Sequence, residues 1–584
     1  MNILVVVAIG SLILVAAYFT YGKFLAEKVF ELNDDNTVPA VEFNDGVDFD
    51  PIPAKYLSGQ HFAAIAAAGP VSGPIQAGIL FGWLPTALWI LVGSIFMGGV
   101  HDMGSLIVSV RHKACGIAET MRIYVSKRVW VLFNIFIFFS LVLIIVAFTD
   151  MTTASFMVDL EVPNLQTGEV EYIKGGAVAT ASFLYCLLPV AMAMCMRYLK
   201  MNLTVATVIF LGLLGLGIWF SPYIPLNMPA EVFGLGGQKV WNIIVILYCL
   251  TAASLPAWIM LQPRGHLGGY FLYVTLGISF IGLIFGGFEV QFPALMSSGV
   301  EGFDWTPTFP VLFITVACGA CSGFHSLVSS GTTSKQLARE SDAKPVGYGM
   351  MLAEGIVALV SLACVMMLPA GDSVLSQSPS LIYANGLAKF GEIIKIPYSF
   401  MMTFGMMAFT SFVYDTLDVC ARLGRYIITE LLSLKGTSGK VISLVISAGV
   451  PLVLMSMSMT DPNGNEVQLW SLFWKTFGAS NQMLAALALI AITVWLQRTA
   501  KRDNIYLVAL IPACIMFAMS SWQLINTIKS NCFKDGAFVL PQGTNVIVPV
   551  LCTIYLVLAV LVAVESAQAI VKTQKARKAG AMKL

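Results

Sequence analysis

The sequence predicts an all-α protein that crosses a lipid bilayer about fifteen times, because three features exclude a soluble globular protein. Hydrophobic residues make up 58% of the 584 residues, and charged residues make up only 11%. The mean hydropathy is +0.82. Apolar runs of about 20 residues, the length of a membrane-crossing helix, recur along the whole chain. The formal net charge of +1 leaves no basic surface of the kind that binds nucleic acid.

Fifteen stretches have the length and composition of a membrane-crossing helix. The first has neither a basic leading segment nor a small-residue cleavage site, so we expect a retained helix and not a signal peptide. In chain order, the stretches are residues 3–20, 62–81, 86–110, 129–148, 177–196, 203–220, 240–261, 269–287, 310–330, 347–368, 397–413, 441–459, 479–496, 505–522 and 546–564.

The distribution of Lys and Arg predicts which loops face the cytoplasm, because basic loops stay on that side of the membrane. Residues 111–128 carry five Lys and Arg residues, whereas residues 150–175 carry five Asp and Glu residues and only Lys174. The first loop is therefore expected inside and the second outside. Alternating the remaining stretches puts roughly 26 of the Lys and Arg residues on the inner side. The N-terminus is then outside and the C-terminus inside.

Two stretches carry signals that interrupt a helix. Residues 61–78 contain the pairs Gly69-Pro70 and Gly73-Pro74, and each proline removes a backbone donor and disfavours α geometry in the residue before it. Residues 251–265 contain a second interruption at Ser254-Leu255-Pro256. Interrupted helices inside a bilayer survive where they are buried or line a cavity. Either one alone is also compatible with a simple packing bend.

The two interruptions lie five stretches apart, so their helices are expected to cross the membrane in opposite directions, which is typical of an inverted repeat. The sequence then divides into four parts. These are residues 1–60 with the first helix and an acidic cytoplasmic linker, 61–230 with the first repeat, 231–430 with the second repeat, and 431–584 with about four additional helices.

The stretch around residues 317–336 carries hydroxyl groups on one helix face. Ser326, Ser329 and Ser330 stand at positions i, i+3 and i+4, a spacing that can offer oxygens to a hard monovalent cation beside an interrupted neighbour. Small hydroxyl residues are equally ordinary packing residues between membrane helices. Sodium is the only metal expected. The histidines of different stretches, His61, His101 and His325, lack the spacing of a transition-metal site.

Ionisable residues inside membrane-crossing stretches are costly and mark candidate functional sites. His101, Asp102 and Glu354 are candidates for proton coupling, although Asp102 could instead pair with a basic residue at the inner surface. Asp415, Asp418 and Arg422 are candidates for gating. Asp418 and Arg422 have the i, i+4 spacing of an ion pair, so we expect them to form part of an ion-pair ladder.

Five segments resemble the carbon starvation protein A (CstA) family of bacterial membrane transporters. They are HFAAIAAAGPVSGPI (61–75), LPAWIMLQPRGHL (255–267), GACSGFHSLVSSGTTSKQ (319–336), TLDVCARLGRYI (416–427) and FGASNQMLAALALI (477–490). The resemblance implies a LeuT-type fold with five-plus-five inverted repeats. It also implies secondary active uptake of peptides or pyruvate across the bacterial inner membrane in response to carbon starvation.

The resemblance also implies where ligands bind. The cation would lie between carbonyls near the first interruption and the serines of the later helix, at Ala66, Gly69, Ser326, Ser329 and Ser330. The substrate would lie beside the two interruptions, at Gly69, Pro70, Gly73, Pro74, Ser254, Leu255, Pro256, Ser322 and His325.

We therefore expect a cation-coupled importer of a peptide or a small molecule, embedded in the lipid bilayer, with no cofactor other than a coupling ion. The hydroxyl cluster favours Na⁺, whereas Asp102 and Glu354 favour H⁺, so the sequence leaves the ion open. No HExxH, GxSxG or comparable catalytic pattern is present, so no enzyme is expected. The alternatives are an ion channel and a membrane nutrient sensor.

Overall fold

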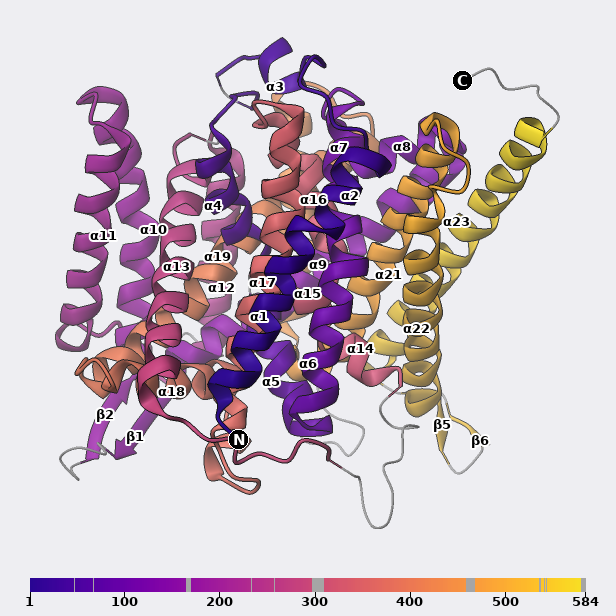
Figure 1. Cartoon of the computed structure of the whole chain (residues 1–584). Helices are drawn as coiled ribbons and strands as arrows, with labels where there is room; N and C mark the ends of the chain where they lie inside the picture. Colours follow the sequence, from indigo (N-terminus) through magenta and orange to yellow (C-terminus); the bar gives the residue numbers. More distant parts are fainter. Residues whose placement is uncertain are drawn as a thin grey trace.

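The computed structural model describes residues 1–46, 48–66, 68–163, 170–232, 234–256, 258–296, 309–457, 468–534, 537–539, 541 and 543–578. Figure 1 shows a bundle of helices between two ends, with the N-terminus at one end and the C-terminus at the other. Each described strand belongs to a two-stranded antiparallel sheet. The sheets pair β1 (Asp159–Pro163) with β2 (Val170–Lys174), β3 (Glu231–Val232) with β4 (Leu235–Gly236), and β5 (Phe533–Lys534) with β6 (Ala537–Phe538).

The helices of the first half include the interrupted pair of the Gly-Pro segment. They are α1 (Ile3–Phe19), α2 (Tyr21–Phe24), α3 (Pro39–Glu42), α4 (Ala54–Ile65), α5 (Gly69–Phe81), α6 (Trp83–Val92), α7 (Gly99–Val110), α8 (Ile117–Tyr124), α9 (Lys127–Met157), α10 (Gly175–Tyr198), α11 (Leu203–Phe220), α12 (Gly237–Ser254) and α13 (Leu261–Gly286). A π-helical segment, Gly93–Gly98, joins α6 to α7.

The second half contains short helices in its first stretch and longer ones after it. They are α14 (Val311–Thr315), α15 (Ala317–Ala320), α16 (Gly323–Gly331), α17 (Met350–Met366), α18 (Pro379–Glu392), α19 (Tyr398–Leu431), α20 (Gly436–Ser456), α21 (Leu469–Thr499), α22 (Leu507–Cys532) and α23 (Ile547–Lys578).

Within the described residues, 11 helices are long and apolar enough to cross a membrane, and α4 with α5, bent by 48° at their break, pass the same test as a pair. The prediction of an all-α membrane protein with many crossings is therefore confirmed. Each of the fifteen predicted stretches coincides with a helix or a series of helices. The stretches on α12, on α14–α16 and on α19 do not pass the test, so the count of fifteen stays a prediction.

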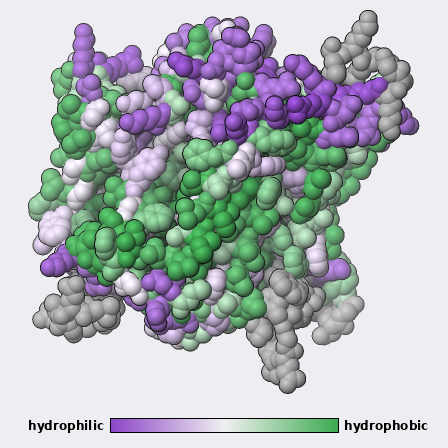
Figure 2. Space-filling view, viewed as in Figure 1, coloured by the Kyte–Doolittle hydropathy of each residue, from purple (hydrophilic) through white to green (hydrophobic). Residues whose placement is uncertain are grey.

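The outer surface matches a protein embedded in lipid. On the face that Figure 2 shows, hydrophobic residues form a band across the middle of the bundle, and hydrophilic residues gather toward its two ends. Exposed apolar side chains of the described helices include Leu12 on α1 and Val208 on α11, which are 67% and 68% exposed. An apolar surface of this extent is costly in water and is stable against hydrocarbon chains.

The second predicted interruption lies between two helices and not within one. Helix α12 ends at Ser254, and α13 begins at Leu261 and continues without a break to Gly286. Pro263 falls in the first turn of α13, where a missing N–H group leaves no hydrogen bond unmade. The described residues 255, 256 and 258–260 lie between α12 and α13, so the predicted stretches 240–261 and 269–287 have different limits in the structure.

The series α14–α16 lies against the first interruption. A Cβ atom on Gly69 would lie 2.2 Å from Cys318 Cβ, and one on Gly73 would lie 2.5 Å from the carbonyl oxygen of Thr315. The hydroxyl of Ser94 also donates to the Gly319 carbonyl at 3.1 Å. The interrupted helix pair α4–α5 therefore packs on the broken series at residues 310–331.

Candidate functional site

The first interruption falls before both Gly-Pro pairs. Helix α4 ends at Ile65, Ala66 leaves the helical region with ψ 56°, and α5 begins at Gly69. Pro70 lies in the first turn of α5, where its missing donor is tolerated, and Pro74 lies inside the helix. The hydroxyl of Thr416 on α19 donates to the Ala64 carbonyl at 3.2 Å. A side chain of a distant helix therefore satisfies a carbonyl at the end of α4.

The predicted substrate-binding glycines are closely packed in this conformation. The side of Gly69 on which a Cβ would lie is filled by Cys318, and that of Gly73 is filled by the backbone of α14. Both glycines, like Pro70 and Pro74, are buried. Their role in substrate binding stays a prediction.

Four predicted residues come together in one buried cluster. Asp102 on α7 lies between two imidazoles, with Oδ1 2.7 Å from His101 Nδ1 and Oδ2 2.8 Å from His325 Nδ1. The other ring nitrogen of His325, on α16, lies 3.3 Å from Glu354 Oε2 on α17. All four side chains are completely buried. The alternative that Asp102 pairs with Lys or Arg is wrong, since both of its recorded partners are histidines. We call these residues the histidine–carboxylate cluster.

Several polar atoms in and beside this cluster have no hydrogen bond within the described part of the chain. They include His101 Nε2, both oxygens of Glu354, and the hydroxyls of Ser105 and Ser329, which lie one helical turn from His101 and His325. Buried polar atoms usually have a hydrogen-bond partner, so buried atoms without one mark places where a proton or a water molecule can bind. An imidazole between two carboxylates can accept a proton on one side and release it on the other.

The three serines of the predicted cation site do not act as one set. Ser326 donates to the Gly323 carbonyl at 2.7 Å. Ser330 donates to the Ser326 carbonyl at 2.6 Å and accepts the backbone N–H of Ile117, at the start of α8, at 3.1 Å. Only the Ser329 hydroxyl lacks a partner in the described residues. Two of the three hydroxyls therefore serve backbone contacts, and a cation site at Ala66 and Gly69 stays a prediction.

Asn481, which the sequence analysis did not select, holds the break between α15 and α16. Its amide nitrogen donates to Ser322 Oγ at 3.0 Å, and its amide oxygen accepts the N–H of Phe324 at 3.0 Å. The oxygen thereby takes up one of the free donors at the start of α16. The Ser480-Asn481-Gln482 run within an apolar stretch was the available signal.

Replacing Asn481 by alanine is expected to lower the free energy of unfolding by about 2 kcal/mol, because it leaves a buried donor without its acceptor. Thermal unfolding of the purified protein in detergent would measure the change. Asn531→Ala is the matched control, since the Asn531 amide donates to the Thr527 carbonyl of its own helix, its one hydrogen bond within the described residues. Equal melting temperatures for the two variants would contradict the assigned role.

A second buried cluster surrounds Arg264, a residue that the sequence analysis also missed. Its guanidinium lies 2.7 Å from Asp415 Oδ1, pairs with Asp418 and donates to the Tyr248 hydroxyl. The Tyr185 hydroxyl donates to the other oxygen of Asp415 at 3.0 Å. We call these five residues the Arg264 cluster. An arginine beside a proline at the start of an apolar stretch was the available signal.

The predicted ion-pair ladder on α19 is wrong. Asp418 pairs with Arg264, whereas Arg422 donates to the carbonyls of Ala252 and Leu255 at 3.2 Å and 2.8 Å. The last carbonyls of α12 lack intrahelical partners and carry partial negative charge, so they attract the Arg422 guanidinium. Ser254 is exposed and donates to the Thr251 carbonyl at 2.7 Å. With Leu255 and Pro256 it terminates α12, and a role in substrate binding stays a prediction.

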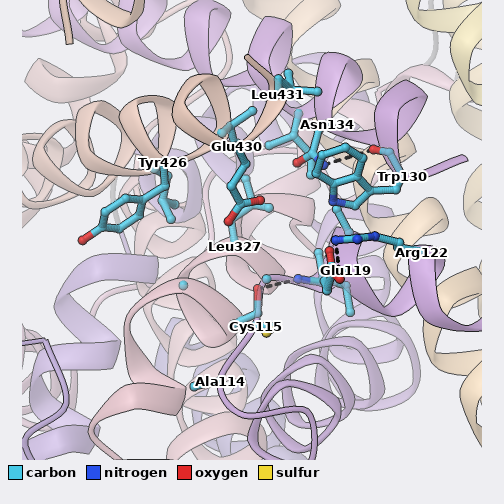
Figure 3. A pocket seen from close by; sticks show the side chains of 18 of the residues that line it. Ala114, Cys115, Glu119, Arg122, Trp130, Asn134, Leu327, Tyr426, Glu430 and Leu431 are labelled. Atoms are coloured by element: carbon cyan, nitrogen blue, oxygen red, sulfur yellow. Dashed lines mark hydrogen bonds and ion pairs between the residues drawn. The ribbon is translucent and has the colours of Figure 1, made fainter. Parts of the chain in front are cut away.

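Two cavities lie near these clusters. The larger, of about 750 Å³, opens at the end of the bundle that carries α8 and the C-terminus. Figure 3 shows Arg122 beside Trp130, with Glu430 extending from α19 between them and Tyr426. The charged residues that line this larger cavity are Lys113, Glu119, Arg122, Lys127, Lys335 and Glu430. The smaller cavity, of about 10 Å³, lies between α4, α13, α16 and α19.

Buried ionisable groups from several membrane-crossing helices, beside an interrupted helix, are the arrangement of a membrane transport protein. The chain belongs to the family of carbon starvation protein CstA, whose model matches residues 2–382 and 371–523. Family membership places it among transporters and not among enzymes.

Several curated proteins are similar over most of the chain. The peptide transporter CstA of Helicobacter pylori (strain J99) is 30% identical, over 91% of this chain and 83% of its own. The peptide transporter CstA of Bacillus subtilis is 29% identical, over 96% of this chain and 97% of its own. The pyruvate/proton symporter BtsT of Escherichia coli is 29% identical, over 91% and 83%. A manganese transporter of Eremococcus coleocola matches at a TM-score of 0.48 and 13% identity over 91% and 99%, a score that does not establish a shared fold.

Proposed function

We propose that this protein is a secondary active transporter that imports peptides or small carboxylates such as pyruvate together with protons. Membership of the CstA family supports transport, and the names of the relatives support these two substrate classes. The observation that carries proton coupling is the contact of His325 with Asp102 and Glu354 inside the bundle. These three residues lie on three helices, so a proton at this site can change how the helices pack.

Protons suit this site better than sodium for two reasons. Two buried carboxylates are costly unless protons or cations neutralise them, and an imidazole between them can hold a proton. The Ser330 oxygen already accepts the backbone N–H of Ile117, which leaves it fewer lone pairs for a metal ion. The histidine–carboxylate cluster is therefore the proposed proton-binding site.

The proposed orientation has the N-terminus outside and the C-terminus in the cytoplasm of a bacterial inner membrane. The loop that precedes α8 and the start of α9 carry Lys and Arg residues, and they line the larger cavity. That cavity is then a cytoplasmic vestibule, and its basic side chains suit the release of a substrate that carries a carboxylate.

The proposed architecture has fifteen crossings, with inverted repeats near residues 61–230 and 231–430 and additional helices from 431. The agreement of all fifteen apolar stretches with helices supports this count. Helices α4–α5 pack on the broken series α14–α16, but the two lie seven predicted stretches apart, so they do not hold equivalent positions in the two proposed repeats.

Cys115 provides a test of the vestibule and of the orientation. It lies in the loop before α8 and lines the cavity. Burial, with help from Glu119 and Glu430, raises the pKa of its thiol, so a smaller fraction is thiolate at neutral pH. We expect a membrane-impermeant maleimide to label Cys115 in inside-out vesicles, slowly at neutral pH and faster as the pH rises. Cys115→Ser is the control, and labelling in right-side-out vesicles would contradict the orientation.

Uptake into proteoliposomes tests the function directly. We expect labelled pyruvate or a labelled dipeptide to accumulate above equilibrium under an imposed proton gradient, and not under a sodium gradient alone. Accumulation driven by sodium alone would contradict proton coupling. Equilibration without accumulation would favour a channel, and no solute movement in folded protein would favour a nutrient sensor.

A further inference from the structure

The Arg264 cluster is a buried ionic site with no part in the proposed proton pathway. Arg264 is completely buried, and its partners Asp415 and Asp418 are each 3% exposed. A buried arginine is tolerated only where carboxylates and carbonyls compensate the loss of water. Both carboxylates come from α19, and the Tyr414 carbonyl of the same helix accepts a further hydrogen bond at 3.0 Å.

The cluster carries one more negative charge than positive charge when both aspartates are ionised. Asp418 Oδ1 has no hydrogen-bond partner among the residues that the structure describes. Arg422, one helical turn along α19, donates its recorded hydrogen bonds to carbonyls of the α12 end. Arg264 is therefore the basic residue that forms ion pairs with the two aspartates.

The cluster adjoins the interrupted helix. Asp415 is next to Thr416, which bonds to the Ala64 carbonyl near the end of α4. The cavity of about 10 Å³, the space of one water molecule, is lined by His61, Ala64, Gly265 and Asp415 among others. Asp415, Thr332 and Thr333 line this cavity, and carboxylate and hydroxyl oxygens are ligands of a monovalent cation.

Two glycines allow α13 to pack closely against α4 and α19, where Arg264 reaches Asp415 and Asp418. A Cβ atom on Gly268 would lie 2.3 Å from Asp415 Oδ2, and one on Gly269 would lie 2.6 Å from the Gly59 carbonyl of α4. Any larger residue would separate α13 from α4 and α19. The close approach brings the α13 backbone beside Asp415, the ion-pair partner of Arg264.

We propose that Arg264 is a tethered cation, which fills a cation site between α4, α13 and α19 and makes transport independent of sodium. Without the guanidinium, the two carboxylates form a vacant site for a small organic cation, for which methylguanidinium is the closest match in shape and charge. This inference rests on the proposed function only for its transport readout, because occupancy of the site also changes the stability of the folded protein.

The test compares the wild-type protein, Arg264→Ala and the charge-balanced double variant Arg264→Gln/Asp415→Asn. Melting temperatures are measured in detergent with millimolar methylguanidinium chloride, sodium chloride or choline chloride. We expect methylguanidinium to raise the melting temperature of Arg264→Ala alone. In substrate exchange across proteoliposomes, we expect Arg264→Ala to lose at least about tenfold in rate, equivalent to about 1.4 kcal/mol, and to recover part of it with methylguanidinium.

Three outcomes would overturn the tethered cation. They are wild-type uptake that requires sodium, equal responses of Arg264→Ala and the double variant to methylguanidinium, and a folded but inactive Arg264→Lys, which keeps the positive charge. Arg264→Lys also decides the question if Arg264→Ala does not fold, because we expect it to transport without sodium. The melting-temperature response does not depend on transport, so failure of the proposed function is distinguishable from failure of this inference.

Discussion

Glu354→Gln is expected to abolish proton-driven accumulation while substrate exchange continues. The substitution keeps the size of the side chain but removes the carboxylate that faces His325 Nε2 at 3.3 Å. With one proton per substrate, a gradient of one pH unit supplies about 1.4 kcal/mol and supports about tenfold accumulation. We expect that ratio to fall to about one in the variant. Uptake driven by the gradient and exchange without a gradient, measured in the same proteoliposomes, separate coupling from binding.

Asp150→Asn is the matched control for this loss. Asp150 is also a buried carboxylate, but it lies on α9, where Gln238 and the backbone N–H of Trp470 donate to it at 3.1 Å and 3.0 Å. We expect the Asp150→Asn variant to reach the same accumulation ratio as the wild-type protein, even if the purified yield of the variant is lower. Normal accumulation by Glu354→Gln would exclude the histidine–carboxylate cluster as the proton site. Equal losses in both variants would indicate a general effect of removing a buried charge.

Gly69→Ala is expected to lower the free energy of unfolding by about 1–3 kcal/mol and to reduce transport strongly. The new methyl group would lie 2.2 Å from Cys318 Cβ and 2.3 Å from its sulfur, so α5 and α15 must move apart. That movement changes the packing of the two interrupted segments on which the proposed site depends. Thermal unfolding in detergent and the initial rate of substrate exchange measure the two effects.

Gly69→Ala/Cys318→Gly tests whether this contact is the cause. Removing the Cys318 side chain provides the space that the new methyl group needs, so we expect part of the stability and of the exchange rate to return. Cys318→Gly alone removes a buried side chain and is measured as the reference for the double-mutant cycle. If the losses of stability and of exchange rate in the two single variants simply add in the double variant, the contact between α5 and α15 is not the reason that position 69 requires glycine.

The sequence was sufficient for the class of protein and for most of its helices. Apolar length and composition are local properties, and a bilayer requires each crossing segment to satisfy its own backbone, so the fifteen stretches could be located one at a time. The ionisable residues Asp102, Glu354, Asp415 and Asp418 could also be selected individually, because a charge inside such a stretch is costly wherever it lies.

The pairing of these residues could not be read in the same way. The i, i+4 spacing of Asp418 and Arg422 predicted an ion pair, but each residue has a better partner on another helix. Arg264 and Asn481 gave only weak local signals, yet both occupy central positions. Helices α4–α5 pack on the broken series α14–α16. That series contains no Gly-Pro pair, so its breaks could not be predicted from the sequence in the way that the first interruption was.

By itself, the sequence determined an all-α protein with many membrane crossings and the family to which it belongs, since hydropathy and motifs are carried by contiguous residues. Only the tertiary structure decided that His101, Asp102, His325 and Glu354 form one buried cluster and that Arg264 joins Asp415 and Asp418. The physical reason is that the net effect of a buried charge depends on partners within a few ångströms. Those partners are supplied by helices far apart in the chain, whose packing no local pattern specifies.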